Sequence, residues 1–336
     1  MVFLSAKPPF HPKKPVFCAI LANTLLSTVP GVSGAGPSAE KTLLTPVLDA
    51  ELITNGAITS LPVKPNTPTG CPTPATITRA MVELCNLQPV FVNAGLCNAP
   101  TVPCVDAYGS AGQDPRFGMA VPHARELFNR GIVIGKTLSA YSDLLVLGEC
   151  VPGGTTTALC VLRALGYPAS VSSSFVTNPV SVKEEICKTA LARIANDRAT
   201  APLELVQYAG DPMMPVAAGI VQGYSGNVLL AGGTQMLAVA ALIKSLGIHL
   251  PSVVTTSYVR DDVSANVEQI AGLIGVSMYY VDPGFGELGH ANLARYCTGE
   301  VKEGTGAGGA MCLAHMVGHT PDEIRQKILT TVTAFS

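Results

Sequence analysis

The sequence is poor in aromatic residues and in charge. Of its 336 residues, 5% are aromatic, none is tryptophan and 13% are charged, with a formal net charge of −2 at pH 7. A chain with this balance has no basic stripe to attract a phosphate backbone, so we expect no nucleic-acid binding. Hydrophobic residues make up 48% of the chain, which favours a large buried core and excludes a disordered or fibrous protein.

The cysteine spacing of a structural zinc site is also missing, because none of the ten cysteines forms a Cys-x-x-Cys pair. Several cysteines fall within apolar runs, where cysteine behaves as a small hydrophobic residue. We therefore expect reduced thiols in a cytoplasmic protein. His315 and His319 lie four residues apart, but HMVGH lacks the glutamate of the HExxH zinc pattern. The sequence thus predicts no metal site.

No long, uninterrupted hydrophobic segment is present. Near the N-terminus, lysines precede a short apolar run, as in a signal peptide, but prolines and Asn23 interrupt the pattern. We interpret PVFCAILANT (15–24) as a buried first strand. Residues 212–243 carry no formal charge, yet glycines and prolines divide them, whereas a spanning helix needs about 20 mainly apolar residues. We predict a helix, a turn, a short strand and a second helix there, and no membrane association.

Short apolar runs alternate with helical patterns over most of the chain. This alternation predicts βαβ units and therefore an α/β fold, with a Rossmann-like parallel sheet flanked by helices. The predicted strands are residues 15–24, 89–95, 143–149, 169–175, 227–233, 252–259 and 276–282, and the helical patterns are residues 120–141, 155–166, 181–195, 214–226 and 234–247. We expect an α/β nucleotide-binding core at residues 85–295. Residues 1–84 and 296–336 are expected to form a smaller subdomain that completes the active site.

Ligands of an open parallel sheet bind beyond the carboxyl ends of its strands, so the turns that follow strands are the place to search. Residues 148–160 read GECVPGGTTTALC, and residues 231–235 read AGGTQ. Glycines let a ligand approach the backbone, and threonines at a helix N-terminus add hydroxyl donors to free N–H groups, which suits a phosphate or a ribose. A plain helix cap is the alternative. The candidate binding residues are Gly153, Gly154, Thr155, Thr156, Gly232, Gly233 and Thr234.

A third glycine-rich turn, EGTGAGGA (303–310), begins with a glutamate and leads into an apolar helix. We expect Glu303 to lie in a partly closed pocket, where burial raises its pKa and makes it a usable general base. Gly304, Thr305 and Gly306 are candidate binding residues in the same turn. An exposed glutamate before a glycine loop is the simpler alternative. The sequence has no GxSxG motif, so a serine hydrolase triad is not indicated.

Together these motifs resemble the nicotinate-nucleotide:dimethylbenzimidazole phosphoribosyltransferase family, in its archaeal and cyanobacterial branch. The resemblance includes ANTLLSTVPGVSGAG, TPVLDAE, PTPATITRA, GECVPGGTTTALCVLRALG, NVLLAGGTQM and KEGTGAGGAM. It implies transfer of the phosphoribosyl group of nicotinate mononucleotide to a benzimidazole-type base. The products would be nicotinate and α-ribazole 5′-phosphate, the lower-ligand nucleotide of cobamides. It also implies a homodimer and no cofactor, because nicotinate mononucleotide is a substrate.

The resemblance further implies roles for individual residues. Glu303 matches the family's catalytic glutamate, which takes the proton from the attacking base nitrogen, and Glu149 matches a second acid near the ribose. The two glycine turns at 153–157 and 232–234 would hold the 5′-phosphate. Lys183 aligns with a family lysine near that phosphate, with Lys188 as a rival. Two other functions stay open: a glycohydrolase or phosphoribosyltransferase that uses a different base, and a non-catalytic nucleotide-sensing protein.

Overall fold

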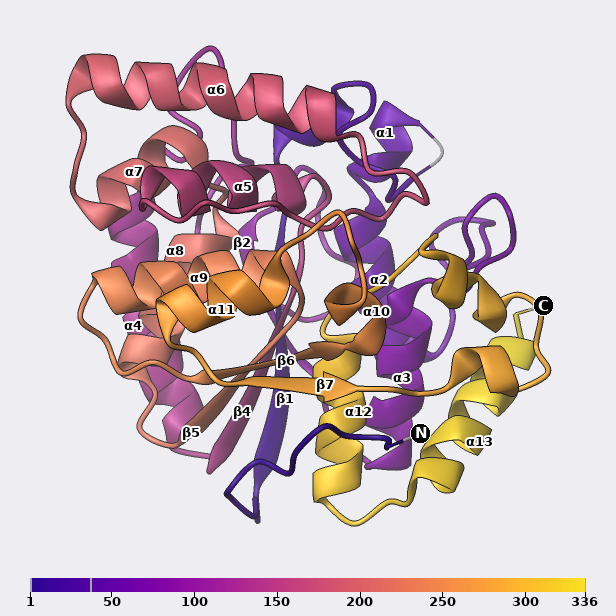
Figure 1. The fold of residues 1–336 in the computed structure, drawn as a ribbon. Helices are drawn as coiled ribbons and strands as arrows, with labels where there is room; N and C mark the ends of the chain where they lie inside the picture. Colours follow the sequence, from indigo (N-terminus) through magenta and orange to yellow (C-terminus); the bar gives the residue numbers. More distant parts are fainter. Residues whose placement is uncertain (1, 37, 336) are drawn as a thin grey trace.

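The structure is a computed structural model that describes residues 2–36 and 38–335. Within these residues, seven strands form one sheet, in which every neighbouring pair is parallel (Figure 1). The strands are β1 (Pro15–Ala22), β2 (Val90–Gly95), β3 (Val105–Asp106), β4 (Leu144–Cys150), β5 (Asn227–Ala231), β6 (Ser252–Thr256) and β7 (Met278–Val281). Their order across the sheet is β3-β2-β1-β4-β5-β6-β7. The predicted α/β class with a parallel sheet is confirmed.

The central strands are buried on both faces, as parallel strands usually are when helices cover the sheet. Every residue of β4 is buried. Alternate residues of β1 face opposite sides: Cys18 and Ile20 pack into one hydrophobic cluster, and Phe17 and Ala19 into the other. The near-continuous apolar sequence of these strands follows from this double burial.

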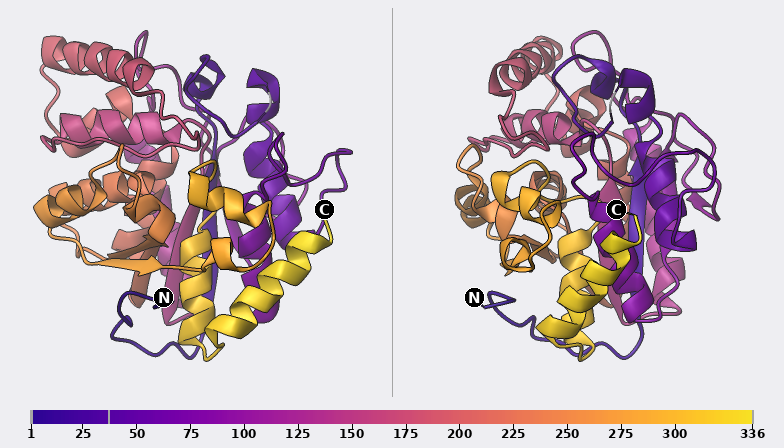
Figure 2. Two further views of the ribbon diagram at one scale, coloured as in Figure 1. Left: turned by 45° about the vertical axis from the view of Figure 1, so that its right-hand side comes forward. Right: turned by 90° about the vertical axis from the view of Figure 1, so that its right-hand side faces the viewer.

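The larger helix layer covers one face of the sheet and encloses the first of these hydrophobic clusters. The 16-residue helix α4 packs along α8, α9 packs between α5 and α11, and α6 lies against α5 and α7 (Figures 1 and 2). The helices of this layer are α4 (Ala124–Ser139), α5 (Gly154–Ala164), α6 (Val180–Asp197), α7 (Pro202–Ala209), α8 (Met213–Gly223), α9 (Thr234–Ser245) and α11 (Val267–Ile274).

The opposite face is covered by helices from both ends of the chain, and these enclose the second cluster. Figure 2 shows the last helices beside the early ones. The helices of this layer are α2 (Thr45–Asn55), α3 (Pro74–Leu84), α12 (Ala307–Met316) and α13 (Pro321–Thr333). The remaining short elements are η1 (Leu25–Thr28), α1 (Ala39–Thr42), α10 (Ser257–Arg260), η2 (Phe285–Glu287) and η3 (Leu293–Thr298).

The segments 1–84 and 296–336 therefore meet through the contacts of α3 with α12 and α13. The first of them also supplies β1, which lies in the middle of the sheet between β2 and β4. The division into a core at 85–295 and a separate subdomain stays a prediction.

All predicted strands but one are present in the sheet, although residues 257–259 of the sixth belong to α10 and not to β6. The prediction of a strand at 169–175 is wrong, because these residues form an irregular loop. The carbonyl groups of Ser172 and Ser173 accept hydrogen bonds from buried lysine side chains and not from a neighbouring strand. The uncharged stretch at 212–243 forms α8, β5 and α9, as predicted. No helix among the described residues is both long and apolar enough to cross a membrane.

The strand order has one topological switch point. The chain proceeds from β1 to β2 and β3 on one side, then returns to β4 on the other side of β1. In parallel sheets of this kind, ligands bind in the crevice outside the carboxyl ends of the two strands at the switch point. The β4 end is Glu149–Cys150, and the β1 end is followed by Asn23 and Thr24.

Candidate active site

The glutamates singled out in the sequence meet at this switch point. The backbones of Gly148 and Gly306 approach so closely that a Cβ on Gly148 would lie 3.0 Å from the Gly306 Cα. Beside this contact, the Thr305 N–H donates to the Glu149 carbonyl oxygen at 3.0 Å. The turn that carries Glu303 is thereby fixed against the end of β4. Gly306 has φ +69°, which a glycine adopts without strain.

Glu303 folds back onto the N-terminus of α12. The Gly308 N–H lies 3.1 and 3.2 Å from the two carboxylate oxygens, and the Thr255 hydroxyl donates to Oε2 at 3.3 Å. A Cβ on Gly308 would lie 2.6 Å from Oε2 and 2.8 Å from the backbone carbonyl carbon of Thr255, and because that backbone cannot easily move, a glycine is needed there. Burial raises the pKa of Glu303 to about 7, against the lowering effect of these hydrogen bonds. Taken as a whole residue, Glu303 is half-buried.

Glu149 lies deeper, with 5% of its surface exposed. Its Oε2 accepts hydrogen bonds from the Val151 N–H and from the Gln235 amide. Burial raises its pKa to about 8, with the charges of Asp211 and Glu303 acting in the same direction. Glu149 is therefore protonated at neutral pH, while Glu303 titrates near neutrality. Two carboxyl groups whose environments separate their pKa values can take different roles in acid–base chemistry.

Two further buried carboxyl groups support this pair. Asp211, fully buried, accepts from the Thr157 hydroxyl at 2.6 Å, and burial raises its pKa to about 6. Asp49 accepts from the Thr305 hydroxyl at 2.7 Å, and burial likewise raises its pKa to about 6. We call the four side chains of Asp49, Glu149, Asp211 and Glu303 the carboxylate cluster. Asp49 and Asp211 each hold one of the turns that carry candidate binding residues.

The glycine turns after β4 and β5 lie side by side. Gly153 caps α5 with φ +81°, and a Cβ on Gly154 would lie 2.3 Å from the Gln235 amide nitrogen. Gly232 lies beside Glu149, since a Cβ there would be 3.7 Å from Oε1 of that glutamate. The N-termini of α5 and α9, the second capped by Gly233, thus point into one region together with Glu149.

Several buried hydroxyl groups in this region have no hydrogen-bond partner among the described residues. They belong to Thr156 on α5, Thr234 on α9 and Ser27, whose Cα lies 3.1 Å from where a Gly153 Cβ would be. Each of the three residues is less than 5% exposed. Buried polar atoms are normally paired, so three unpaired hydroxyl groups around two helix N-termini favour a polar ligand such as a phosphate or a ribose.

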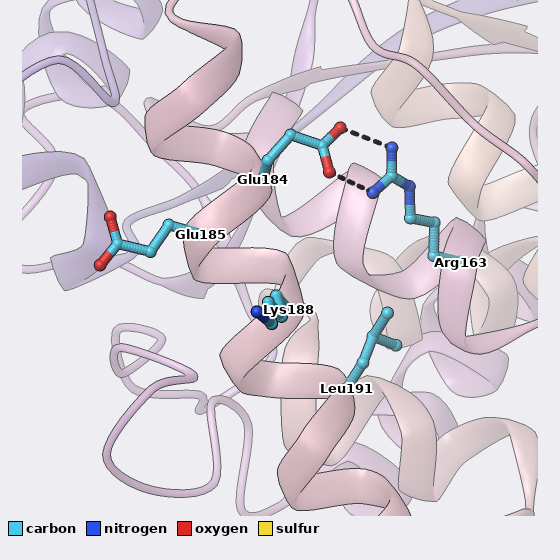
Figure 3. Close-up of a pocket in the computed structure, with 5 residues that line it drawn as sticks. All are labelled: Arg163, Glu184, Glu185, Lys188 and Leu191. Atoms are coloured by element: carbon cyan, nitrogen blue, oxygen red, sulfur yellow. Dashed lines mark hydrogen bonds and ion pairs between the residues drawn. The ribbon is translucent and has the colours of Figure 1, made fainter.

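Lys183 lies in the first turn of α6 and is 1% exposed. Its ammonium donates to the Ser172 carbonyl at 2.8 Å, and burial lowers its pKa to about 7. Lys188, the rival, is exposed on the outer face of the same helix. It lines a surface cavity with Arg163, which forms two hydrogen bonds to Glu184 (Figure 3). This cavity lies at the far end of α5 from the glycine turns.

The structure therefore gathers the predicted residues of all three turns at one edge of the sheet and separates Lys188 from them. Other side chains lie at this edge that the sequence did not indicate, namely Asp49, Asp211, Gln235, Thr255, Lys302 and Ser27. One signal was available for Asp211, since an aspartate directly precedes the long uncharged run at 212–243. Gln235 and Lys302 lie in the quoted motifs AGGTQ and KEGTGAGGAM, whereas Asp49, Thr255 and Ser27 come from elements that only tertiary packing brings to the site.

All ten cysteines lie within the described residues and none forms a disulfide. Six are buried, and Cys97 and Cys297 are exposed. The Cys150 thiol donates to Asp49 at 3.3 Å, and burial raises its pKa well above the usual range. Within residues 2–36 and 38–335, no group of three or more His, Cys, Asp or Glu side chains is arranged to hold a metal ion.

The fold is similar to that of two solved structures. It is similar to the solved structure of nicotinate-nucleotide-dimethylbenzimidazole phosphoribosyltransferase from Thermus thermophilus, with a TM-score of 0.62 and 15% identity, over 95% of this chain and 84% of that one. A structure of CobT from the same organism gives a TM-score of 0.59 and 16% identity, over 97% and 85% of the two chains. The fold implied by the sequence resemblance is confirmed.

Close relatives are found among archaeal proteins, although no family model matches the chain. The UPF0284 protein of Methanosarcina mazei is 43% identical over 94% of each chain. That of Thermococcus onnurineus is 43% identical over 94% of this chain and 96% of its own. The chain belongs to the UPF0284 protein family.

Proposed function

We propose that this protein transfers the phosphoribosyl group of nicotinate mononucleotide to a benzimidazole-type base, as the sequence resemblance implies. The products are nicotinate and α-ribazole 5′-phosphate. The observation that carries the proposal is the position of Glu303: a carboxylate with a pKa near 7, beside two glycine turns with unpaired hydroxyl groups, at the switch point of the sheet. The similarity in fold to the Thermus enzyme supports the same assignment.

Glu303 acts as the general base. As the base nitrogen attacks the anomeric carbon, the C–N bond to nicotinate breaks, and Glu303 takes the proton that the attacking base loses. Attack from the face opposite nicotinate inverts the configuration from β to α. A carboxylate with a pKa near the working pH suits this step, and general base catalysis contributes about 10²–10⁴-fold. Holding both reactants in line can supply about 7–11 kcal/mol of the barrier.

Glu149, protonated at neutral pH, donates a hydrogen bond to a ribose hydroxyl. Because the protonated carboxyl group carries no charge, it does not repel the negatively charged phosphate of the substrate. The N-termini of α5 and α9, with the hydroxyl groups of Thr156 and Thr234, hold the phosphate or the ribose. Lys183 adds a cation for the phosphate. An anchored phosphate far from the reacting bond provides binding energy that helps to position the sugar. We also expect a homodimer, which sedimentation analysis of the purified chain can test.

Nicotinate release from nicotinate mononucleotide, measured with and without a panel of bases, tests the proposal. The panel contains dimethylbenzimidazole, other benzimidazoles, adenine and phenols. Release that depends on a base, with a ribosylated base as the product, establishes the transferase and identifies its acceptor. Release without a base, with free ribose 5-phosphate as the product, would identify a glycohydrolase. Binding of the nucleotide with no release under any condition would contradict turnover and identify a nucleotide sensor.

A further inference from the structure

A second buried lysine lies close to Lys183 and is not among the residues that the sequence indicated. Lys302 is 8% exposed, and its ammonium donates to the Ser173 carbonyl at 2.8 Å and to the Gly299 carbonyl at 3.1 Å. It also pairs with the Asp262 carboxylate at 3.3 Å. Its charge is one of the causes that lower the pKa of Lys183, after burial. We call Lys183 and Lys302 the lysine pair.

The ammonium groups of the two lysines have different numbers of hydrogen-bond acceptors. The Lys302 ammonium has carbonyl and carboxylate partners on several sides. The Lys183 ammonium, by contrast, has a single acceptor among the described residues, the Ser172 carbonyl. An ammonium carries three donors, and a buried donor without a partner is costly. Lys183 therefore has donors to spare for a ligand, whereas Lys302 is already held in place.

The loop between the two lysines depends on both of them. The carbonyl groups of consecutive residues, Ser172 and Ser173, each accept from one lysine. The Ser172 hydroxyl also donates to Asp262 at 2.7 Å. Residues 169–175 are therefore fixed by side chains from two distant segments. Removal of Lys302 would release one end of this loop and change the position of the Lys183 acceptor.

The charges of Lys183, Lys302 and Asp262 do not balance. Burial raises the pKa of Asp262, but hydrogen bonds from Ser264 and Ser172 and the charge of Lys302 outweigh it, so the pKa is lowered and this carboxylate is ionised. With both lysines protonated, two positive charges face one negative charge. An anion such as a phosphate would offset the remaining positive charge, and buried charges are normally paired. The residue after Lys302 is Glu303, whose carboxylate contacts α12 and β6 and not this loop.

We propose that Lys302 is a positioning residue that sets Lys183 and residues 172–175 to bind the 5′-phosphate of the donor, and that it thereby makes the site select a nucleotide over the corresponding nucleoside. This inference rests on the proposed function. Lys183 donates to the phosphate oxygens, and Lys302 holds the loop and supplies charge. Although Lys302 and Glu303 are adjacent in the chain, their side chains are held by different elements, Lys302 by the loop and Glu303 by α12 and β6.

The test is calorimetric titration of the full-length protein with nicotinate mononucleotide and with nicotinate riboside, which lacks the phosphate. We expect K302M to weaken mononucleotide binding by about tenfold, in the range of a hydrogen bond to a charged group, and to leave riboside binding unchanged. K302R should recover most of the loss. K188M removes an exposed lysine from α6 and serves as the matched control, with no effect on either ligand.

K302M leaves Asp262 buried without its partner, so the double variant K302M/D262N, which leaves no unpaired carboxylate, provides a second test with the same expected discrimination. An equal loss for both ligands, or no loss for the mononucleotide, would overturn the proposal. Failure of the wild-type protein to bind nicotinate mononucleotide would instead refute the proposed function. In that case, calorimetric titration with ribose 5-phosphate tests the anion site separately. Binding of ribose 5-phosphate to the wild-type protein that is weaker in K302M supports the anion site. No binding of ribose 5-phosphate to the wild-type protein overturns the proposal.

Discussion

The carboxylate cluster and the lysine pair are both buried, but they form hydrogen bonds with different backbone groups. The carboxyl groups of Glu303 and Glu149 accept from N–H groups at the start of a helix or turn, at the ends of the sheet strands. The lysines donate to carbonyl groups of a loop that has no ladder partner. Burial shifts the pKa values of Glu303 and Glu149 upward and the pKa of Lys183 downward, in each case toward neutrality.

The difference suggests how the proposed site would combine acid–base chemistry with anion binding near pH 7. Burial, with smaller contributions from the charges of Asp211 and Glu303, raises the pKa of Glu149 above that of Glu303, so Glu303 is the glutamate that loses its proton first as the pH rises. The lysine pair does not contact the two glutamates, because the Lys302 side chain points to the loop at Ser173 and the Glu303 side chain points to the start of α12. The acidic and basic groups thus do not neutralise each other by direct pairing. Substitutions in the carboxylate cluster should therefore affect catalysis, and substitutions in the lysine pair should affect nucleotide binding.

The largest effect is expected from E303Q. Glutamine keeps the shape of the side chain and can still accept from the Gly308 N–H, but it cannot take a proton. We expect base-dependent nicotinate release to fall by about 10²–10⁴-fold, with nucleotide binding largely intact. Steady-state kinetics and calorimetry measure the two quantities. E300Q, three residues earlier on a carboxylate that bonds Thr67 and Arg295, is the matched control. A wild-type rate in E303Q would show that the general base is another group.

E149Q should stabilise the fold in alkaline solution. The pKa of Glu149 is about 8 in the folded protein and near 4.5 in the unfolded chain, so only the folded state holds this proton between these values. Stability therefore falls as the pH rises from about 4.5 to about 8. Glutamine has no proton to lose. We expect E149Q to be more stable than wild type at pH 8.5, by on the order of 5 kcal/mol, and nearly equal to it at pH 4.

Thermal unfolding at the two pH values measures this difference. E184Q provides a contrast of opposite sign, because the hydrogen bond from Arg163 lowers the pKa of Glu184. This pair is partly exposed, so its loss should cost at most about 1 kcal/mol at pH 8.5. A lower melting temperature of E149Q at pH 8.5 would show that Glu149 is ionised and paired in the folded state.

K183M should weaken binding of nicotinate mononucleotide by about 10- to 100-fold, because it removes a hydrogen bond between two charged groups. The rate at saturating nucleotide should change much less, since Lys183 does not contact the reacting bond. KM and kcat measured separately for the variant test this division. K188M, on the exposed side of the same helix, should leave both constants unchanged. A fall in kcat alone would contradict a binding role.

The pH dependence of kcat/KM is expected to be bell-shaped and centred near pH 7. Glu303 must be ionised to act as a base, so activity rises as the pH passes through its pKa of about 7. Lys183 must be protonated to bind the phosphate, so activity falls as the pH passes through its pKa, also about 7. Each limb should change roughly tenfold per pH unit well away from the centre.

The variant K183R separates the two limbs, because arginine stays charged throughout this range. We expect the alkaline limb to move to higher pH or disappear and the acid limb to stay in place. An alkaline limb that is unchanged in K183R would show that it belongs to another group, such as Glu149.

The sequence could predict most of the sheet because buried parallel strands read as continuous apolar runs. The two-residue strand β3 is too short to leave such a pattern. The alternation at 169–175 is that of a strand, yet two lysines distant from each other in the sequence occupy its carbonyl groups. Propensity cannot reveal partners that only the tertiary fold supplies.

The candidate site shows the same division. The glycine turns and Glu303 could be recognised from the sequence because glycines, threonines and a glutamate occur together between apolar segments. Gln235 is the last residue of the quoted turn AGGTQ, but its role is evident only from its hydrogen bond to Glu149. Asp49, from α2, meets Thr305 across 256 residues of sequence, and no local pattern marks such a pair.

The distribution of the ten cysteines has a practical consequence for work on this protein. Only Cys97 and Cys297 are exposed, whereas Cys150 is buried beside the candidate active site and its pKa is raised, which leaves little of the reactive thiolate. A chromogenic thiol reagent should therefore react quickly with the exposed pair and reach the six buried thiols only when the chain opens. The ratio of fast to total thiols is then a direct assay of how much of a preparation is natively folded. The exposed pair also offers attachment points for a fluorophore that leave Glu149 and its neighbours untouched.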